Sequence, residues 1–169
     1  MDFYAERPPH AADERTQLVG WLDLQRKLVR HKLDGLKPDD EHRGVFPDSP
    51  LMTPAGLVAH LKWTEHCWFN VIFSGEPKDS NPQFRQDLPD DAEWMVEGVP
   101  LAQLLAEYDA QWARSNEITA AHGLDELGQQ EDFKPSLRWV LIHMVEETAR
   151  HVGQLDTMRE LLDGQRGYY

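Results

Sequence analysis

The last long segment of the chain, residues 135–164, constrains the fold more than any other stretch. Its apolar side chains recur at alternating spacings of four and three residues, which is the pattern of one long amphipathic helix with a heptad-like packing stripe. The stripe consists of Leu137, Leu141, Met144, Thr148, His151, Leu155, Met158 and Leu162.

Two polar residues on this helix need an explanation. His151 is itself a member of the stripe, and Glu147 lies one turn before it on the same face. A carboxylate is almost never buried unless it is paired or bound to a metal. The pair therefore has two interpretations, a helix salt bridge or part of a metal site.

Three further segments have the periodicity of amphipathic helices, and Thr53 and Pro54 form a typical N-cap and first helical position. The predicted helices span about 13–36, 54–75, 100–121 and 135–164. Four such helices without strand-like alternation predict an all-α fold, a four-helix bundle. No linker or repeat divides the chain, so we expect residues 1–169 to form a single domain.

The segment between the second and third predicted helices is unusually long. Residues 75–99 contain several prolines and acids, and a loop of this length in a compact domain is often functional. Within it, the fragment DDAEWMVEG predicts a short helical turn.

Charge and cysteine content exclude several classes of function. The chain has 17 Lys plus Arg against 30 Asp plus Glu, a formal net charge of −13, which argues against binding to nucleic acid or to anionic membrane surfaces. Cys67 is the only cysteine, so an intrachain disulfide is excluded and a reducing compartment fits. No signal region and no apolar run of about 20 residues is present. We therefore expect a cytoplasmic protein without a membrane segment.

His60 extends the candidate site to a second helix. It lies on the inward stripe of the second predicted helix, and with Glu147 and His151 it makes a set of two imidazoles and a carboxylate. This set suits zinc, nickel or iron(II), and three protein ligands leave a position open for water or substrate. A lone core histidine is more often structural, but three such groups on core stripes favour a metal. Spacing alone does not show that the two helices face each other.

Other polar residues near these stripes are not interpreted as metal ligands. His143, two turns before His151 at the edge of the same face, is a candidate for substrate contact or proton relay. Cys67 is interpreted as a core filler rather than a nucleophile. Glu65 and His66 are predicted to lie on the surface. Glu-x-x-His pairs of the di-iron type and the HExxH motif are absent.

Three segments resemble the DinB-like superfamily, and within it the actinobacterial branch that includes the N-terminal domain of mycothiol-dependent maleylpyruvate isomerase. They are DERTQLVGWLDLQRKLV, TPAGLVAHLKWTEHCWF and IHMVEETARHVGQLDTMRELLDG. The resemblance extends from about residue 13 to residue 164, and it is specific because all three segments occur in order.

The resemblance implies a four-helix bundle, often homodimeric, that holds a divalent metal, in most cases zinc or nickel. His60 and His151 match two of the family's ligand positions, and Glu147 matches the glutamate of the isomerase branch. Characterised relatives use mycothiol, bacillithiol or glutathione as cosubstrate. The isomerase has an additional C-terminal domain that this chain, which ends at Tyr169, lacks, so a simpler thiol transferase is expected.

These expectations combine into one hypothesis. The protein is a divalent-metal-dependent thiol S-transferase, with zinc preferred over nickel or iron, in which His60, Glu147 and His151 hold the metal. The metal activates a low-molecular-weight thiol, mycothiol in the first place, for attack on an electrophilic small molecule, and His143 relays the proton. The alternatives are a non-catalytic metal-binding stress-response homodimer and a metal-assisted hydrolase.

Overall fold

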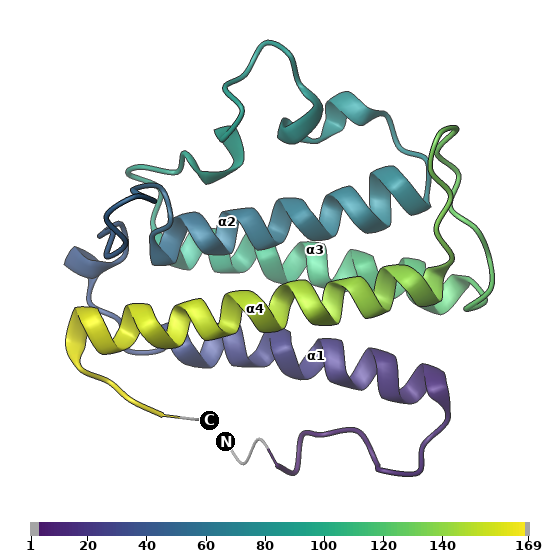
Figure 1. Cartoon of the computed structure of the whole chain (residues 1–169), viewed down its shortest axis with the longest axis horizontal. Coiled ribbons are helices and arrows are strands. Elements are labelled where there is room, and N and C mark those ends of the chain that lie inside the picture. Colours follow the sequence, from purple (N-terminus) through teal and green to yellow (C-terminus); the bar gives the residue numbers. More distant parts are fainter. Residues whose placement is uncertain (1–3, 168–169) are drawn as a thin grey trace.

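Four long helices make up the architecture of the computed structural model, which describes residues 4–167 (Figure 1). They are α1 (Glu14–Leu33), α2 (Pro54–Glu65), α3 (Leu101–Ala121) and α4 (Leu137–Asp163). Across the described residues there is no strand, only an isolated antiparallel bridge between Leu127 and Ser136. The predicted all-α four-helix bundle is confirmed.

The helix ends follow the sequence signals. The Thr53 side chain accepts a hydrogen bond from the Gly56 backbone N–H at the start of α2, and Ser136 accepts one from Trp139 at the start of α4. Helix α4 ends at Gly164, whose φ of 74° is in the left-handed region. The predicted N-cap at Thr53 and the stop at Gly164 are therefore both confirmed.

The second predicted helix differs from the prediction in its last part. Helix α2 ends at Glu65 and continues as a π-helix, η2 (His66–Phe73). In this segment the buried Asn70 donates a hydrogen bond to Glu76 and accepts one from Gln111 of α3, while Phe69 and Phe73 remain in the core. The wider turn thus accommodates a buried polar side chain among aromatic core residues.

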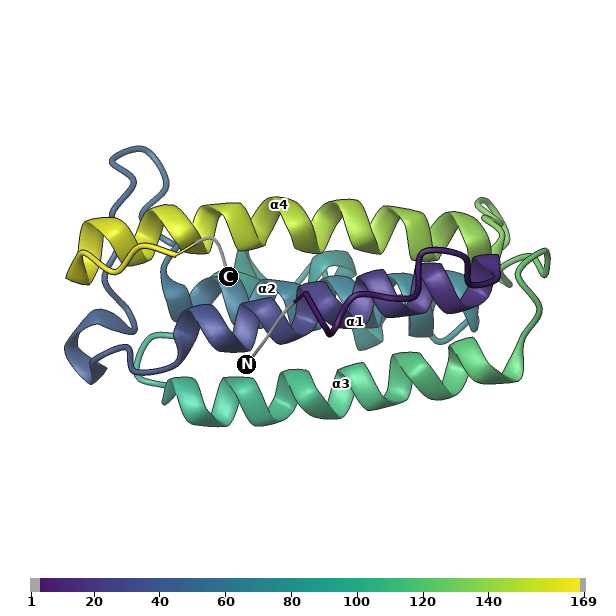
Figure 2. The ribbon, with the colours of Figure 1, turned by 90° about the horizontal axis from the view of Figure 1, so that it is seen from below.

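Helix α1 packs mainly on α4, and α2 packs mainly on α3 (Figures 1 and 2). The buried apolar side chains form two groups. One includes Leu28, Leu57, Leu61, Tyr108 and Leu155, and the other includes Leu22, Phe69, Phe73, Leu137, Leu141 and Met144. Both groups contain side chains from α4, so this helix connects the two halves of the core.

Two loops close over the first turn of α2. The loop before α2 contains a short 3₁₀ turn, η1 (Pro38–Asp40), and the long loop after η2 contains three, η3 (Lys78–Ser80), η4 (Pro82–Phe84) and η5 (Ala92–Trp94). The last of these confirms the predicted helical turn. At Gly56 a Cβ atom would lie 2.4 Å from the Leu51 carbonyl oxygen and 3.3 Å from that of Trp94. Glycine therefore permits both loops to approach α2 (Figure 1).

The prediction that Glu65 lies on the surface was wrong. Its carboxylate is buried and accepts two hydrogen bonds of 2.7 Å from the equally buried guanidinium of Arg26 in α1. His66, also predicted on the surface, is half-buried against Trp63. The periodicity of a single helix did not reveal the ion pair because its cation is 39 residues away. Burial is tolerated since the pair is bidentate.

Within residues 4–167, no helix is both long enough and apolar enough to cross a lipid bilayer.

Candidate metal centre

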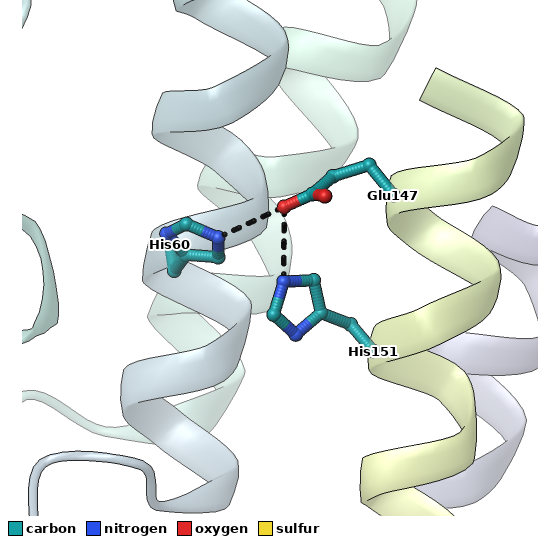
Figure 3. A group of neighbouring side chains, drawn as sticks. All are labelled: His60, Glu147 and His151. Atoms are coloured by element: carbon teal, nitrogen blue, oxygen red, sulfur yellow. Dashed lines mark hydrogen bonds and ion pairs between the residues drawn. The ribbon is translucent and has the colours of Figure 1, made fainter. Parts of the chain in front are cut away.

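The side chains of His60, Glu147 and His151 point toward one another across the interface between α2 and α4 (Figure 3). One ligand atom from each lies within 4.8 Å of the other two. Glu147 Oε1 is 3.5 Å from His60 Nε2 and 3.1 Å from His151 Nε2. The structure thus supplies what spacing could not, namely that the two helices face each other at these residues.

The helical framework determines this geometry. Glu147 and His151 are four residues apart on α4, so they project from successive turns on one side. His60 stands opposite them near the middle of α2. All three are sheltered but accessible, since the side chains of His60, Glu147 and His151 are 15%, 16% and 7% exposed.

A residue from the long loop fixes the orientation of His60. Nδ1 of His60 lies 2.7 Å from Oε1 of Glu93, and because a carboxylate oxygen only accepts, Nδ1 carries the proton and donates it. The Trp94 ring stacks on the imidazole with centroids 4.1 Å apart. Nε2 of the ring therefore faces Glu147, and in the neutral ring its lone pair is available to a metal ion.

His151 is oriented in the same way. Its Nδ1 lies 2.6 Å from the amide oxygen Oε1 of Gln154, one turn later on α4. This hydrogen bond assigns the proton of the neutral ring to Nδ1 and leaves the lone pair on Nε2. Metal-binding histidines are commonly held through the second nitrogen in this manner, which fixes the tautomer and ring orientation. The residues present therefore fit a divalent cation among the two Nε2 atoms and the carboxylate.

The electrostatics of the metal-free site also favour the binding of a cation. When both ring nitrogens are protonated, Nε2 of His151 and, to a smaller extent, Nε2 of His60 donate hydrogen bonds to Glu147, and these hold the pKa of its carboxyl well below its usual range. Burial lowers the pKa of His60, but hydrogen bonds and charges from Glu147 and Glu93 outweigh it, so the pKa ends above the ordinary value. An ionised carboxylate with strongly polarised imidazoles attracts a proton or, in its place, a metal cation.

His143 and Cys67 lie beside this centre. His143, one turn before Glu147, is half-buried, with its ring 4.4 Å from Trp68 and 5.2 Å from Trp139 by centroid. Among residues 4–167, no hydrogen bond, ion pair or ring contact joins His143 to the three converging side chains. Burial raises the pKa of the Cys67 thiol to about 12, which agrees with a core filler rather than a nucleophile.

Four residues that touch the histidines were not identified as site residues from the sequence: Glu93, Trp94, Gln154 and Thr64, whose Oγ1 lies 3.3 Å from Nε2 of His60. The contact of Gln154 with His151 could have been predicted, since Gln154 lies three residues after His151 on the same helix and side chains at that spacing are neighbours. Glu93 and Trp94 belong to the long loop, and the predicted helical turn around them was the only local sign. Nothing in the sequence specified that this turn reaches His60.

The family model described as mycothiol-S-transferase matches residues 17–164. The match includes all of α2, α3 and α4, and therefore His60, Glu147 and His151. No curated protein matches the chain.

Proposed function

Because the chain belongs to the mycothiol-S-transferase family, we propose that it transfers mycothiol to an electrophilic small molecule at a divalent metal held by His60, Glu147 and His151. Membership makes the protein a transferase with mycothiol as its thiol substrate. One observation carries the metal assignment. Both imidazoles are held through Nδ1 by groups outside the trio, so both Nε2 atoms face Oε1 of Glu147.

The chemistry of the donors supports zinc within this proposal. Two neutral imidazoles and one carboxylate are a usual set for a catalytic zinc site, with nickel or iron(II) as alternatives. When bound, such a cation lowers the pKa of a thiol that reaches it and so favours the thiolate at neutral pH.

The residues of the chain have distinct roles in the proposed reaction. Glu93 and Gln154 hold the two imidazoles in their tautomers, and Trp94 covers one face of His60. In the transfer, the thiol loses its proton, a sulfur–carbon bond forms and the leaving group departs with its electron pair. We assign acceptance of the proton to His143, an assignment supported by its position one turn from Glu147 on α4.

Several finer assignments belong to the same proposal. We propose a cytoplasmic protein in which residues 1–169 form a single domain, related to the branch that includes the maleylpyruvate isomerase domain; the glutamate at position 147 supports that relationship. We also propose a homodimer. The exposed side chains of Trp139 and Ile142 on α4 support it, and light scattering coupled to size-exclusion chromatography tests it.

The metal assignment is tested by elemental analysis of the purified protein. We expect close to one equivalent of a divalent metal in the wild type and a loss of most of it in a His60→Ala, His151→Ala double variant. His10→Ala is a suitable control because this exposed histidine lies outside the site. Equal metal content in the wild type and the double variant would refute the assignment.

The transfer reaction is tested with mycothiol and monochlorobimane, in which a sulfur–carbon bond replaces the carbon–chlorine bond and chloride leaves. We expect a rate that requires both protein and metal and that falls in the double variant. Hydrolysis of esters or amides without added thiol would favour a metal-assisted hydrolase instead. Metal binding without turnover of any thiol would favour a non-catalytic protein.

A further inference from the structure

Two clefts lie on either side of residues 46–52, which we call the 46–52 loop. The first, of about 500 Å³, lies between this loop and α4. The second, of about 360 Å³, lies between the loop and η5. Asp48, Ser49 and Met52 border both clefts, so the same loop forms a wall of each, and we call the two clefts together the loop recess. Its size suits a small-molecule ligand.

The loop recess adjoins the candidate metal centre through two side chains that contact its histidines. Gln154 borders its first cleft and also holds His151 through the 2.6 Å hydrogen bond to Nδ1. Trp94 borders its second cleft and stacks on His60. A ligand in either half therefore lies beside a side chain that contacts one of the two histidines. This places the recess where the non-reacting part of a substrate would extend from the metal.

The lining of the loop recess combines neutral hydrogen-bonding groups with apolar walls. Ser49 and Thr157 supply hydroxyls, and Phe46 and Met52 supply apolar surface. Gln154 uses its amide oxygen on His151, while its amide N–H₂ makes no hydrogen bond to any residue from 4 to 167. Donors and acceptors of this kind match a ligand rich in hydroxyl groups.

The charge of the loop recess is negative. Asp48 and Asp91 line it, and within the described part of the chain neither carboxylate has a cationic partner. The one cation in the lining, Arg150, is already paired with Glu146. The chain as a whole carries a formal charge of −13. A ligand that brings further carboxylates into the recess is repelled.

Resting on the proposed function, we propose that the loop recess binds the uncharged glucosaminyl-inositol part of mycothiol and that Asp48 and Asp91 select against thiols that carry carboxylates. Mycothiol has hydroxyl groups and amides but no carboxylate. Glutathione and bacillithiol each carry two. Charge and hydroxyl recognition together thus determine which cellular thiol reaches the metal centre.

The experiment compares mycothiol and glutathione as thiol donors to monochlorobimane. In an Asp48→Asn, Asp91→Asn variant we expect the ratio of kcat/KM for mycothiol to that for glutathione to fall about fivefold to tenfold at low ionic strength, and by less at 0.5 M salt. An Asp39→Asn, Glu97→Gln variant removes the same charge from exposed positions outside the recess. This control retains the wild-type ratio. An unchanged ratio in the first variant, or an equal change in the control, overturns the proposal.

A binding measurement separates this inference from the proposed function. S-methylmycothiol and S-methylglutathione cannot form a thiolate, so calorimetric titration with them measures recognition without the reaction. We expect S-methylmycothiol to bind the wild type more tightly, and the Asp48→Asn, Asp91→Asn variant to narrow the difference. This result without turnover of any thiol supports the recess and refutes the transferase. Turnover with no binding of S-methylmycothiol, or with an unchanged difference, refutes the recess and supports the transferase.

Discussion

Replacement of Glu93 by alanine is expected to weaken metal binding although Glu93 is not one of the three proposed ligands. The substitution removes the acceptor that holds the proton of His60 on Nδ1. Without it the neutral imidazole can also place its proton on Nε2, the atom that faces Glu147, and the ring loses an orienting contact. Part of the binding free energy must then be spent on selecting the correct tautomer and orientation.

The magnitude follows from the geometry of the contact. The hydrogen bond is 2.7 Å long, and the His60 and Glu93 side chains are only 15% and 13% exposed. It therefore resembles a sheltered hydrogen bond to a charged group more than a surface ion pair, and its loss costs about 1.5–2.7 kcal/mol. This corresponds to a Kd for the metal about 10–100 times larger, the range found for loss of outer partners of metal ligands. Glu93→Gln keeps an oxygen acceptor without the charge, so we expect a smaller loss.

The assay is a competition titration of zinc against a chromophoric chelator, with the metal-free protein as starting material. Glu97→Ala is the matched control, because Glu97 is an exposed acid in the same loop. Nitrogen-15 NMR of the histidine rings gives a second readout, since the wild type should show His60 protonated on Nδ1 and Glu93→Ala a mixture of tautomers. A Kd within twofold of the wild type, together with an unchanged tautomer, would refute the reasoning.

Three further predictions concern the core, the cysteine and the pH dependence of the metal centre. Glu65→Ala leaves the buried Arg26 guanidinium without its bidentate partner, so urea unfolding should show a loss of about 3–5 kcal/mol; a loss below 1 kcal/mol would contradict the buried ion pair. Cys67, whose pKa burial raises to about 12, should not react with a disulfide reagent such as DTNB at pH 8 until guanidinium unfolds the protein, and fast labelling of the native state would contradict this. Zinc affinity should decrease as pH falls, because Glu147 and Glu93 raise the pKa of His60 in the metal-free protein. A proton on His60 therefore begins to compete with the metal at a higher pH than a proton on an ordinary histidine does. A constant Kd between pH 8 and pH 6 would argue against His60 as a ligand.

Local signals in the sequence were sufficient to locate the four helices, except for the π-helical end of the second, and to select the three residues that converge between α2 and α4. The predicted cap at Thr53 acts within three residues, and the four-residue spacing of Glu147 and His151 is an internal property of one helix. His60 could be identified from the sequence for the same reason. Its position on the apolar stripe of the second helix follows from helical periodicity alone, without knowledge of the rest of the fold.

The sequence was less informative wherever a contact joins separate elements. Glu65 was assigned to the surface because helical periodicity assumes one buried face, whereas its partner Arg26 covers it from α1. The contact between Glu93 and His60 likewise spans 33 residues and depends on the path of a long loop. Helical periodicity does not show which separate element packs against a given residue. The contacts of Glu65 with Arg26 and of Glu93 with His60 therefore became identifiable only in the three-dimensional structure.

Gly56 carried more information than its place in the first turn of α2 suggested. A glycine inside a helix costs about 1 kcal/mol relative to alanine, so its presence there implies a compensating close approach. The approach is by the carbonyl oxygens of Leu51 and Trp94, one from each loop. Leu51 and Trp94, which carry these oxygens, both border the loop recess, and the Trp94 ring stacks on His60. The absence of one methyl group therefore allows the two loops that form the proposed substrate recess to reach the metal centre.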